Sequence, residues 1–376
     1  MRILLAPDKF KGTYSARQAA YHLAVRLGTL RPDFILESCP VADGGEGTLD
    51  SLEIAGAVKT DLDTVNALGR PVRSPFARGQ NRQGPFLAFE SATCLSLAIL
   101  PPSLRNPLHT SSYGLGLLIR RALEKQSAPK IIVGLGGTAT VDGGAGFLSA
   151  LGAVFQDSAG PLEYPPRGGD LGRIRSIDLG MTKELLKGIR LEAWCDVVSP
   201  LLGPKGAAHL FGPQKGASPH AVQTLEKGME CFASLLEKKL GRPLREEPGA
   251  GSAGGLGLAV SALGGTLCRG FDAVADTLGL EEKIKSCDAV ITGEGRLDAS
   301  TRQGKAPWGV KCMADRYGKP CFVVAGQTSD SEGGWAGEVL LLDHPGDIEG
   351  LSPSEWDLRW DHASRRLAEM LDKVRK

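Results

Sequence analysis

Two carboxylates stand three residues apart in a glycine-rich turn near the start of this 376-residue chain. Asp43 and Glu46 flank Gly44 and Gly45, and a pair of adjacent glycines argues against a helix interior. Carboxylates at this spacing can hold Mg²⁺, or one of them can act as a general base. The alternative interpretation is a turn that only caps the following helix.

Two further glycine-rich turns carry acids. Asp142 precedes a pair of glycines, and Glu294 and Asp298 share a later turn predicted at 293–298. Each has the same two interpretations, a functional carboxylate or a cap. Because all three turns follow an apolar run, we favour a shared function over three independent coincidences.

Lysines stand beside similar turns, where an ammonium group could meet a phosphate. Lys9 and Lys11 follow the first apolar run together with Asp8. Ordinary solvated lysines are the alternative for this pair. Lys215 lies in a turn so rich in glycine that it offers little packing, which favours a functional role.

The glycine-rich segment 248–257 can be interpreted in two ways. It can form an anion-binding loop that leads into a helix, or it can let two elements pack closely through small residues. It contains a GxGxxG pattern at 249–254, but two glutamates and a proline precede it rather than an apolar strand. The pattern is therefore weak support for a dinucleotide site.

The elements that must position these residues alternate between short apolar runs and amphipathic stretches, the pattern of an α/β fold. Strands are predicted at 3–6, 34–39, 130–135, 288–292 and 320–325. Helices are predicted at 49–55 and 307–317 and from 353 to the C-terminus; one further helix begins at residue 16, and another ends at residue 151. Ligands of such sheets bind at the carboxyl ends of the strands, where glycines let backbone N–H groups approach an anion.

Length and composition narrow the class of protein. A chain of 376 residues exceeds one ordinary core, so two domains are expected. A balance of 44 Lys+Arg against 43 Asp+Glu argues against a partner that is nucleic acid or an anionic membrane. No signal peptide or membrane span is apparent, so a cytoplasmic protein is expected, with its eight cysteines as free, mostly buried thiols.

Long motifs in a fixed order make the chain resemble the bacterial glycerate kinase family, the type that forms 2-phosphoglycerate. The motifs are APDKFKG at 6–12, PVADGGEGT at 40–48, GLGGTATVDGGAG at 134–146, WCDVVSPLLG at 194–203, FGPQKGA at 211–217, PGAGSAGGLG at 248–257, VITGEGRLD at 290–298 and GKAP at 304–307. The resemblance implies phosphorylation of D-glycerate by ATP with Mg²⁺. Whether the protein forms a homodimer is left undecided by the resemblance.

The same resemblance implies an α/β fold of two domains with the active site in the cleft between them. Residues 1–74 and 285–376 are expected to form a flavodoxin-like (Rossmann-like) parallel-sheet domain. Residues 75–284 are expected to form an inserted second α/β domain.

The resemblance also gives roles to the residues singled out above. The predicted catalytic residues are Lys11, Asp43, Glu46, Asp142, Lys215 and Arg296, and Asp43 and Glu46 are also the candidate Mg²⁺ ligands. The predicted substrate- and phosphate-binding residues are Asp8, Lys9, Gly44, Gly45, Gly136, Gly137, Thr138, Asp196, Gly251, Gly254, Glu294 and Asp298. Arg296 would clamp the substrate carboxylate, and the loops at Gly136 and Gly251 would surround the triphosphate.

The chain departs from the family pattern at five positions, Leu117, Val141, Ser199, Ala208 and Ser300. Each change removes or shrinks a polar group, and several are expected near the cleft. The identity of the phosphoryl acceptor is therefore left undetermined by the resemblance. A kinase for a related small hydroxy or sugar acid is one alternative, and a non-catalytic ligand-binding protein on the same scaffold is another.

Overall fold

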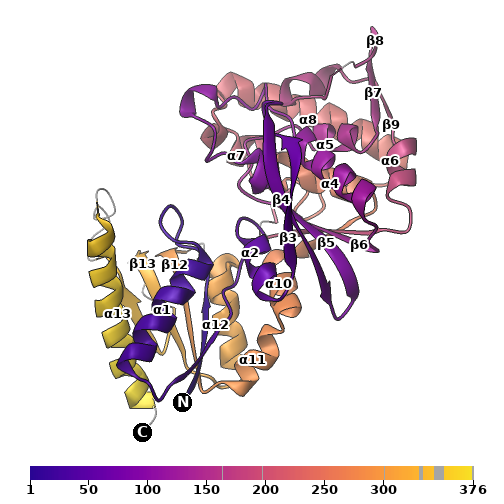
Figure 1. Ribbon diagram of the computed structural model, residues 1–376. Coiled ribbons are helices and arrows are strands. Elements are labelled where there is room, and N and C mark those ends of the chain that lie inside the picture. The colour runs from indigo at the N-terminus through magenta and orange to yellow at the C-terminus, as the bar shows by residue number, and fades with distance from the viewer. Residues whose placement is uncertain (163, 197, 300, 330–332, 343–350, 375–376) are drawn as a thin grey trace. The chain divides into compact units, whose positions relative to one another are not determined.

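A computed structural model describes residues 1–162, 164–196, 198–299, 301–329, 333–342 and 351–374 (Figure 1). The chain divides into two compact units. Unit 1 comprises Met1–Asp43, Asp50–Ala55 and Phe271–Lys376, and unit 2 comprises Gly44–Leu49 and Gly56–Gly270. Each unit has its own sheet and its own apolar core.

The sheet of unit 1 is entirely parallel. Its strands are β1 (Arg2–Pro7), β2 (Ile35–Ser38), β12 (Ala289–Leu297), β13 (Cys321–Thr328) and β14 (Gly337–Leu340), in the order β14-β13-β12-β1-β2. Counted along this unit, the order is 2-1-3-4-5, which is the flavodoxin-like order. The predicted fold of this part of the chain is therefore confirmed.

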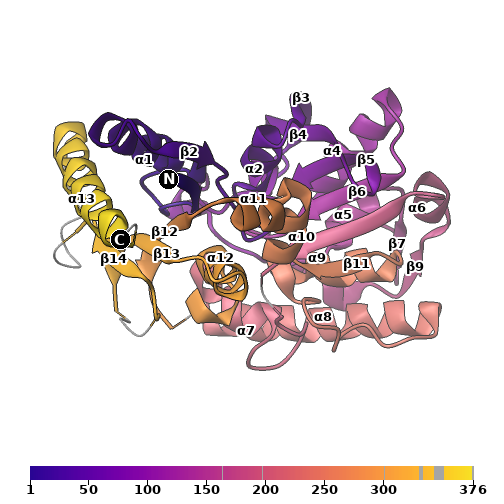
Figure 2. The ribbon, with the colours of Figure 1, turned by 90° about the horizontal axis from the view of Figure 1, so that it is seen from below.

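Helices cover both faces of this sheet, as its continuous apolar strands require. The helices α1 (Ala16–Leu30) and α13 (Pro353–Val374) pack on one face, and α11 (Leu280–Ser286) and α12 (Ala306–Arg316) on the other (Figure 2). Leu23 of α1 and Trp360 of α13 are fully buried against Ile3 and Leu5 of β1. Ser15 starts α1 as a capping box with Gln18.

The main sheet of unit 2 is mixed. Its strands are β3 (Val58–Val65), β4 (Pro71–Asn81), β5 (Gly84–Glu90), β6 (Lys130–Gly134), β10 (Arg190–Cys195) and β11 (Thr266–Arg269), in the order β11-β10-β6-β5-β4-β3. The four strands β5, β6, β10 and β11 are parallel, while β3, β4 and β5 form an antiparallel ladder. The strands β7 (Val154–Asp157), β8 (Gly160–Pro161) and β9 (Ser176–Asp178) form a small separate sheet.

The remaining helices follow from apolar residues at helical spacing. In α8 (Pro219–Leu240), Leu225, Met229, Phe232 and Leu236 form one buried stripe. The others are α2 (Thr48–Ile54), α3 (Ala92–Leu95), α4 (Tyr113–Lys125), α5 (Ala145–Ala150), α6 (Gly180–Leu185), α7 (Ala207–Phe211), α9 (Ser252–Ala262) and α10 (Gly270–Leu278), with short 3-10 turns at Pro102–Leu104, Gly168–Arg173, Pro213–Lys215 and Thr301–Gln303.

One predicted turn is wrong. The segment 293–298 was expected to leave the sheet after a strand at 288–292, but β12 continues to Leu297. Glu294 and Arg296 pair with Ala325 and Gln327 of β13, so the ladder runs through the motif. Glycine permits this, because a Cβ at Gly326 would overlap the carbonyl oxygen of Gly295.

The two units differ in their bounds from the predicted domains. The antiparallel ladder of β3 and β4 with β5 places residues 58–74 in the sheet of unit 2, whereas the expected boundary is 74/75. The second expected boundary is 284/285, and unit 1 resumes at Phe271.

All eight cysteines are free thiols, and five of them are buried, as expected. Among the described residues, we find no helix with both the length and the apolar character needed to cross a membrane.

Candidate active site

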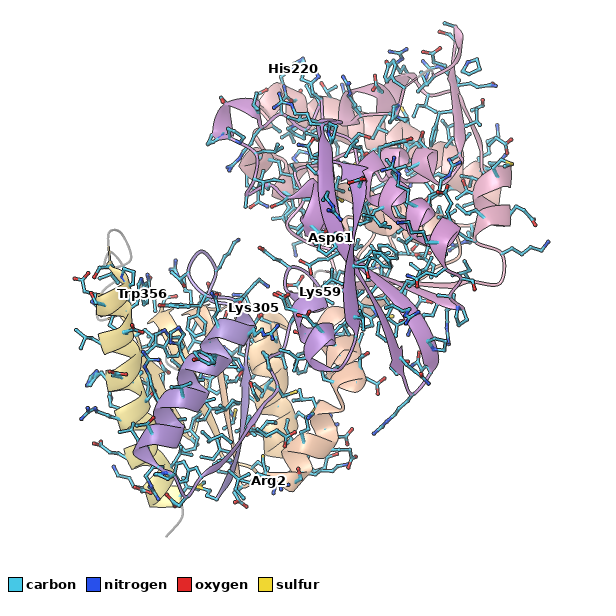
Figure 3. The ribbon with its side chains drawn as sticks, viewed as in Figure 1. Arg2, Lys59, Asp61, His220, Lys305 and Trp356 are labelled. Carbon is cyan, nitrogen blue, oxygen red and sulfur yellow. The ribbon has the colours of Figure 1, made fainter. Side chains whose placement is uncertain are left out.

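The carboxyl edge of the unit 1 sheet contains a topological switch point. The chain leaves β1 toward β2 on one side, while β12 lies on the other side of β1. Open α/β sheets bind ligands where the connections diverge in this way. Asp8 follows β1 directly, Glu294 is part of β12, and Lys305 precedes α12 at the end of the unit opposite Arg2 (Figure 3).

A lysine joins two of the predicted acids at this edge. Lys9 Nζ lies 3.3 Å from Asp43 Oδ2 and 3.8 Å from Asp8 Oδ1. Asp8 is only 5% exposed and accepts a 2.7 Å hydrogen bond from the backbone N–H of Lys9. Burial raises the pKa of Asp8 to about 7; Lys9 opposes the shift, and the carboxylates of Asp43 and Glu294 add to it.

Glu294 is held by two residues that sequence reasoning did not single out. Its Oε1 accepts a 2.7 Å hydrogen bond from Thr301 Oγ1, and its Oε2 lies 3.3 Å from Lys305 Nζ. Lys305 is also 3.7 Å from Asp298. Burial raises the pKa of Glu294, and Lys305 opposes that shift most strongly. Lys305 belongs to the GKAP motif at 304–307, and this membership is the sequence feature that could have identified it as a site residue.

The two other predicted basic residues of unit 1 are exposed. Arg296 has a side chain that is 63% exposed, with Nε 3.9 Å from Asp298 Oδ2. It lies two residues after Glu294 in β12, so both side chains project from the same face of the strand. Lys11 is exposed in the turn that follows β1. Both can be reached by a ligand from solvent.

The turn that follows Asp43 belongs to unit 2, where a buried acid holds it. Glu90, at the end of β5, accepts hydrogen bonds from the backbone N–H groups of Gly47 (3.0 Å) and Leu49 (3.2 Å). Gly44 has a φ of +89°, and a Cβ there would crowd Trp194 and Gly270. Gly44 is therefore needed for close packing, and a Cβ on Gly136 would lie only 3.1 Å from the Cα of Gly45. No sequence pattern pointed to Glu90.

Glu46 and Asp43 are not members of the same compact unit. Glu46 is exposed and lies in unit 2, whereas Asp43 is the last residue of the first segment of unit 1. Within the described ranges, no group of three or more His, Cys, Asp or Glu side chains is arranged to hold a metal ion. The joint Mg²⁺ site of Asp43 and Glu46 stays a prediction.

Asp142 has the geometry of a helix cap. It is fully buried, and its Oδ2 accepts hydrogen bonds from Ser112 N (2.7 Å), Ser112 Oγ (2.8 Å) and Gly146 N (3.2 Å), while Oδ1 accepts one from Gly144 N. Burial raises its pKa, although these hydrogen bonds oppose the shift. Both oxygens face the starts of α4 and α5, so Asp142 caps these helices in this structure, and its predicted role as a base stays a prediction.

Lys215 is buried beneath the glycine-rich loop that follows β6. It is 4% exposed, and its Nζ donates hydrogen bonds to Thr138 Oγ1 (3.2 Å) and to the carbonyl oxygen of Thr140 (2.8 Å). Burial lowers its pKa to about 7, and Asp142 opposes the shift. The ammonium fastens the loop in this structure, and its expected contact with phosphate stays a prediction.

The segment 248–257 uses its glycines for close packing. Ala253, Gly254 and Gly255 are left-handed within α9, and a Cβ at Gly254 would overlap the carbonyl oxygen of Thr140. The backbone N–H of Gly143 donates to the Gly254 carbonyl oxygen at 3.0 Å. The structure therefore shows close packing against the 140–144 loop, and the anion-binding role predicted for Gly251 and Gly254 stays a prediction.

The other predicted binding residues of unit 2 lie at the carboxyl edge of its parallel strands. Gly136 exchanges hydrogen bonds with the hydroxyl of Ser91, and the neighbouring Gly137 is exposed. Asp196 follows β10 directly and is half-buried. Gly251 packs against Pro200, where a Cβ would overlap the proline carbonyl oxygen.

The departures from the family pattern do not all line a site. Val141 and Ala208 are fully buried in the apolar core of unit 2, so their side chains pack in that core. Leu117 and Ser199 are half-buried. Ser300 lies outside the described residues.

Comparisons with known proteins agree with one another. A sequence model of the Glycerate kinase family matches residues 3–338. The chain is 42% identical to a glycerate kinase of Bacillus subtilis (strain 168), covering 88% of this chain and 86% of the relative. It is 40% identical to a glycerate 2-kinase of Escherichia coli (strain K12), covering 89% and 87%.

A solved structure is similar over nearly the whole chain. It is the crystal structure of a candidate glycerate kinase 2 from Salmonella typhimurium LT2, with 34% sequence identity and a TM-score of 0.84. The similarity covers 99% of this chain and 98% of that one.

Proposed function

Because the chain belongs to the glycerate kinase family, a family of kinases, we propose that it transfers the γ-phosphoryl group of ATP to D-glycerate and forms 2-phosphoglycerate. The observation that supports this most directly is the cluster of carboxylates and lysines at the switch point of unit 1. Asp8, Asp43 and Glu294 supply the acids, and Lys9 and Lys305 supply the cations.

Phosphoryl transfer requires mainly positioning and neutralisation of charge. Lys11 and Arg296 are exposed, so they can approach a phosphate and a substrate carboxylate from solvent. A planar guanidinium suits a carboxylate, which favours Arg296 as the clamp. The ion pair with Lys9 orients the Asp43 carboxylate, which we propose as the acceptor of the hydroxyl proton.

Magnesium is proposed as a companion of ATP. When bound, Mg²⁺ neutralises charge on the transferring phosphates. The donor set of the unit 1 cluster suits a hard cation, because Asp8, Asp43 and Glu294 contribute carboxylate oxygens to it. Mg²⁺ keeps several waters and needs only one or two carboxylates, and we propose Asp8 and Glu294 as those that would hold it.

A substrate assay with product identification tests the proposal. Purified protein with ATP and Mg²⁺ should consume ATP only when D-glycerate is added, and ³¹P NMR should show 2-phosphoglycerate rather than the 3-isomer. Activity with a different small hydroxy or sugar acid, and none with D-glycerate, would replace the acceptor. Calorimetry that detected ligand binding without turnover would instead identify a binding protein.

A further inference from the structure

We propose that unit 2 carries a second small-molecule site, which takes an organic anion with an apolar body. The site is a cavity of about 350 Å³ at the amino ends of β10 and β11, where Arg190 and Thr266 begin those strands. The predicted binding loops of unit 2 follow the carboxyl ends of β6 and β10. The cavity therefore lies at the opposite edge of the same sheet.

The floor of the cavity is apolar and open to a ligand. Leu186, Ile189, Leu240 and Leu263 line it, and all four are only half-buried although they pack on the core of unit 2. These side chains come from the ends of α6, α8 and α9 and from the start of β10. A ligand with a hydrocarbon or aromatic body would cover them, and the volume is within the range of small-molecule pockets.

The rim of the cavity carries three cations. Lys183, Arg190 and Arg242 line it, and no aspartate or glutamate does. Arg242 is engaged, since it pairs with Glu247 at 2.8 Å and donates to the Ser261 carbonyl oxygen. The side chains of Lys183 and Arg190 form no ion pair or hydrogen bond within the described residues, so they stay available to an anion.

The ends of three helices meet here, and cations at helix C-termini can simply neutralise the final carbonyl groups. Arg242 does so through Ser261. Lys183 and Arg190 do not, because neither donates to a helix carbonyl in the part of the chain that the structure describes. This pair therefore favours a carboxylate, sulfonate or phosphate head above the apolar floor.

Fluorescence titration with 8-anilinonaphthalene-1-sulfonate, an aromatic anion, tests the site. The titration is done with saturating Mg·ADP and D-glycerate, so that the candidate active site is occupied. Wild-type protein should bind one equivalent, and octanoate should displace it while octylammonium should not. The double variant Lys183→Glu/Arg190→Glu should weaken binding at least tenfold. Ile189→Trp, which fills the cavity without changing charge, should weaken it as well.

Lys187→Glu is the matched control. Lys187 lies between Lys183 and Arg190 in the sequence, has a side chain that is 74% exposed, and does not line the cavity. It should leave the titration unchanged, and all variants should keep the wild-type circular dichroism. Equal binding by the wild type and the double variant would overturn the proposal. So would equal displacement by octylammonium, or abolition of the signal by Mg·ADP and D-glycerate.

Discussion

Lys9 Nζ lies 3.3 Å from Asp43 Oδ2, and this ion pair joins the turn after β1 to the segment after β2. Both side chains are mostly buried, with exposed fractions of 20% and 16%. An ammonium in this position holds the carboxylate in one orientation while leaving part of it accessible. The pair is therefore the natural place to test the proposed chemistry.

Asp43→Asn should reduce turnover by about a thousandfold, equivalent to roughly 4 kcal/mol of transition-state stabilisation. The amide keeps the size of the side chain but loses its charge and its capacity to accept a proton. Steady-state kinetics with D-glycerate and ATP measures the effect. Asp361→Asn, which alters an exposed carboxylate of the same unit paired with Arg26, should leave turnover unchanged. A loss below tenfold in Asp43→Asn would remove this residue from the proposed mechanism.

Asp8 should make the stability of the protein depend on pH. Its pKa is raised from 3.8 to about 7, so between these values the folded protein holds a proton that the unfolded chain has released. The contribution of Asp8 to stability therefore falls as the pH rises through this window. Asp8→Asn does not titrate, and from pH 5 to pH 8 it should gain about 2 kcal/mol relative to the wild type.

Urea unfolding in EDTA without nucleotide measures this difference. The asparagine oxygen can still accept the hydrogen bond from the Lys9 N–H, so the fold is retained. Asp361→Asn again serves as the control and should show a constant difference from the wild type across the same pH range. A constant difference for Asp8→Asn as well would mean that Asp8 is ionised throughout.

Lys215 should have the opposite dependence at higher pH. Its pKa is lowered from 10.5 to about 7, so above pH 7 the unfolded chain holds a proton that the folded protein has lost. Stability then rises with pH in this window. The wild type should gain about 2 kcal/mol over Lys215→Met between pH 7 and pH 9. Lys187→Met, at an exposed position, should show no such trend when the same unfolding curves are recorded.

Asp142→Ala should destabilise the protein by roughly 3 to 5 kcal/mol, because it leaves several buried donors unsatisfied. The backbone N–H groups of Ser112, Gly144 and Gly146 all lose their acceptor. Asp178→Ala removes an exposed cap of Gly180 in the same unit and should cost less than about 1 kcal/mol. Denaturant unfolding compares the two variants, and equal costs would argue against a structural role for Asp142.

Local patterns predicted β1, β2, β6, β12 and β13, because these buried parallel strands are short apolar runs whose turns are marked by glycine. The flavodoxin-like order came instead from the resemblance to the glycerate kinase family. Local patterns could not distinguish a partly exposed carboxylate such as that of Asp43 from a buried one that caps helices. Asp142 and Asp43 lie in similar turns, yet Asp142 is enclosed by the starts of α4 and α5. The contact with Ser112 is made by a residue thirty positions earlier in the chain, which no local pattern reveals.

The partners of Glu294 were missed for a related reason. Thr301 and Lys305 follow it after a bend, and their contact with Glu294 depends on β12 continuing to Leu297. Sequence reasoning ended that strand early because glycines usually interrupt strands. Here Gly293, Gly295 and Gly326 permit the backbones to approach closely, so the glycines support the sheet instead.

Gly254 is the position where the role of glycine in close backbone packing can be tested most directly. Its φ is +76°, and a Cβ would overlap the carbonyl oxygen of Thr140, which is also the acceptor of Lys215. Gly254→Ala should therefore cost about 2 to 5 kcal/mol, since strain and overlap add to each other. Gly241→Ala is the matched control, because Gly241 has a φ of +69° but nothing within 4 Å of a Cβ. It should cost only about 1 kcal/mol.

Refolding yield and urea unfolding distinguish the two glycine variants even where Gly254→Ala is too unstable to purify in quantity. The Gly241→Ala protein should refold as the wild type does and unfold at slightly lower urea. The Gly254→Ala protein should refold poorly or unfold far earlier, because the 140–144 loop cannot pack on α9. If the two variants proved equally stable, this loop would have to move away from Gly254 without cost, and the close packing described for segment 248–257 would be wrong.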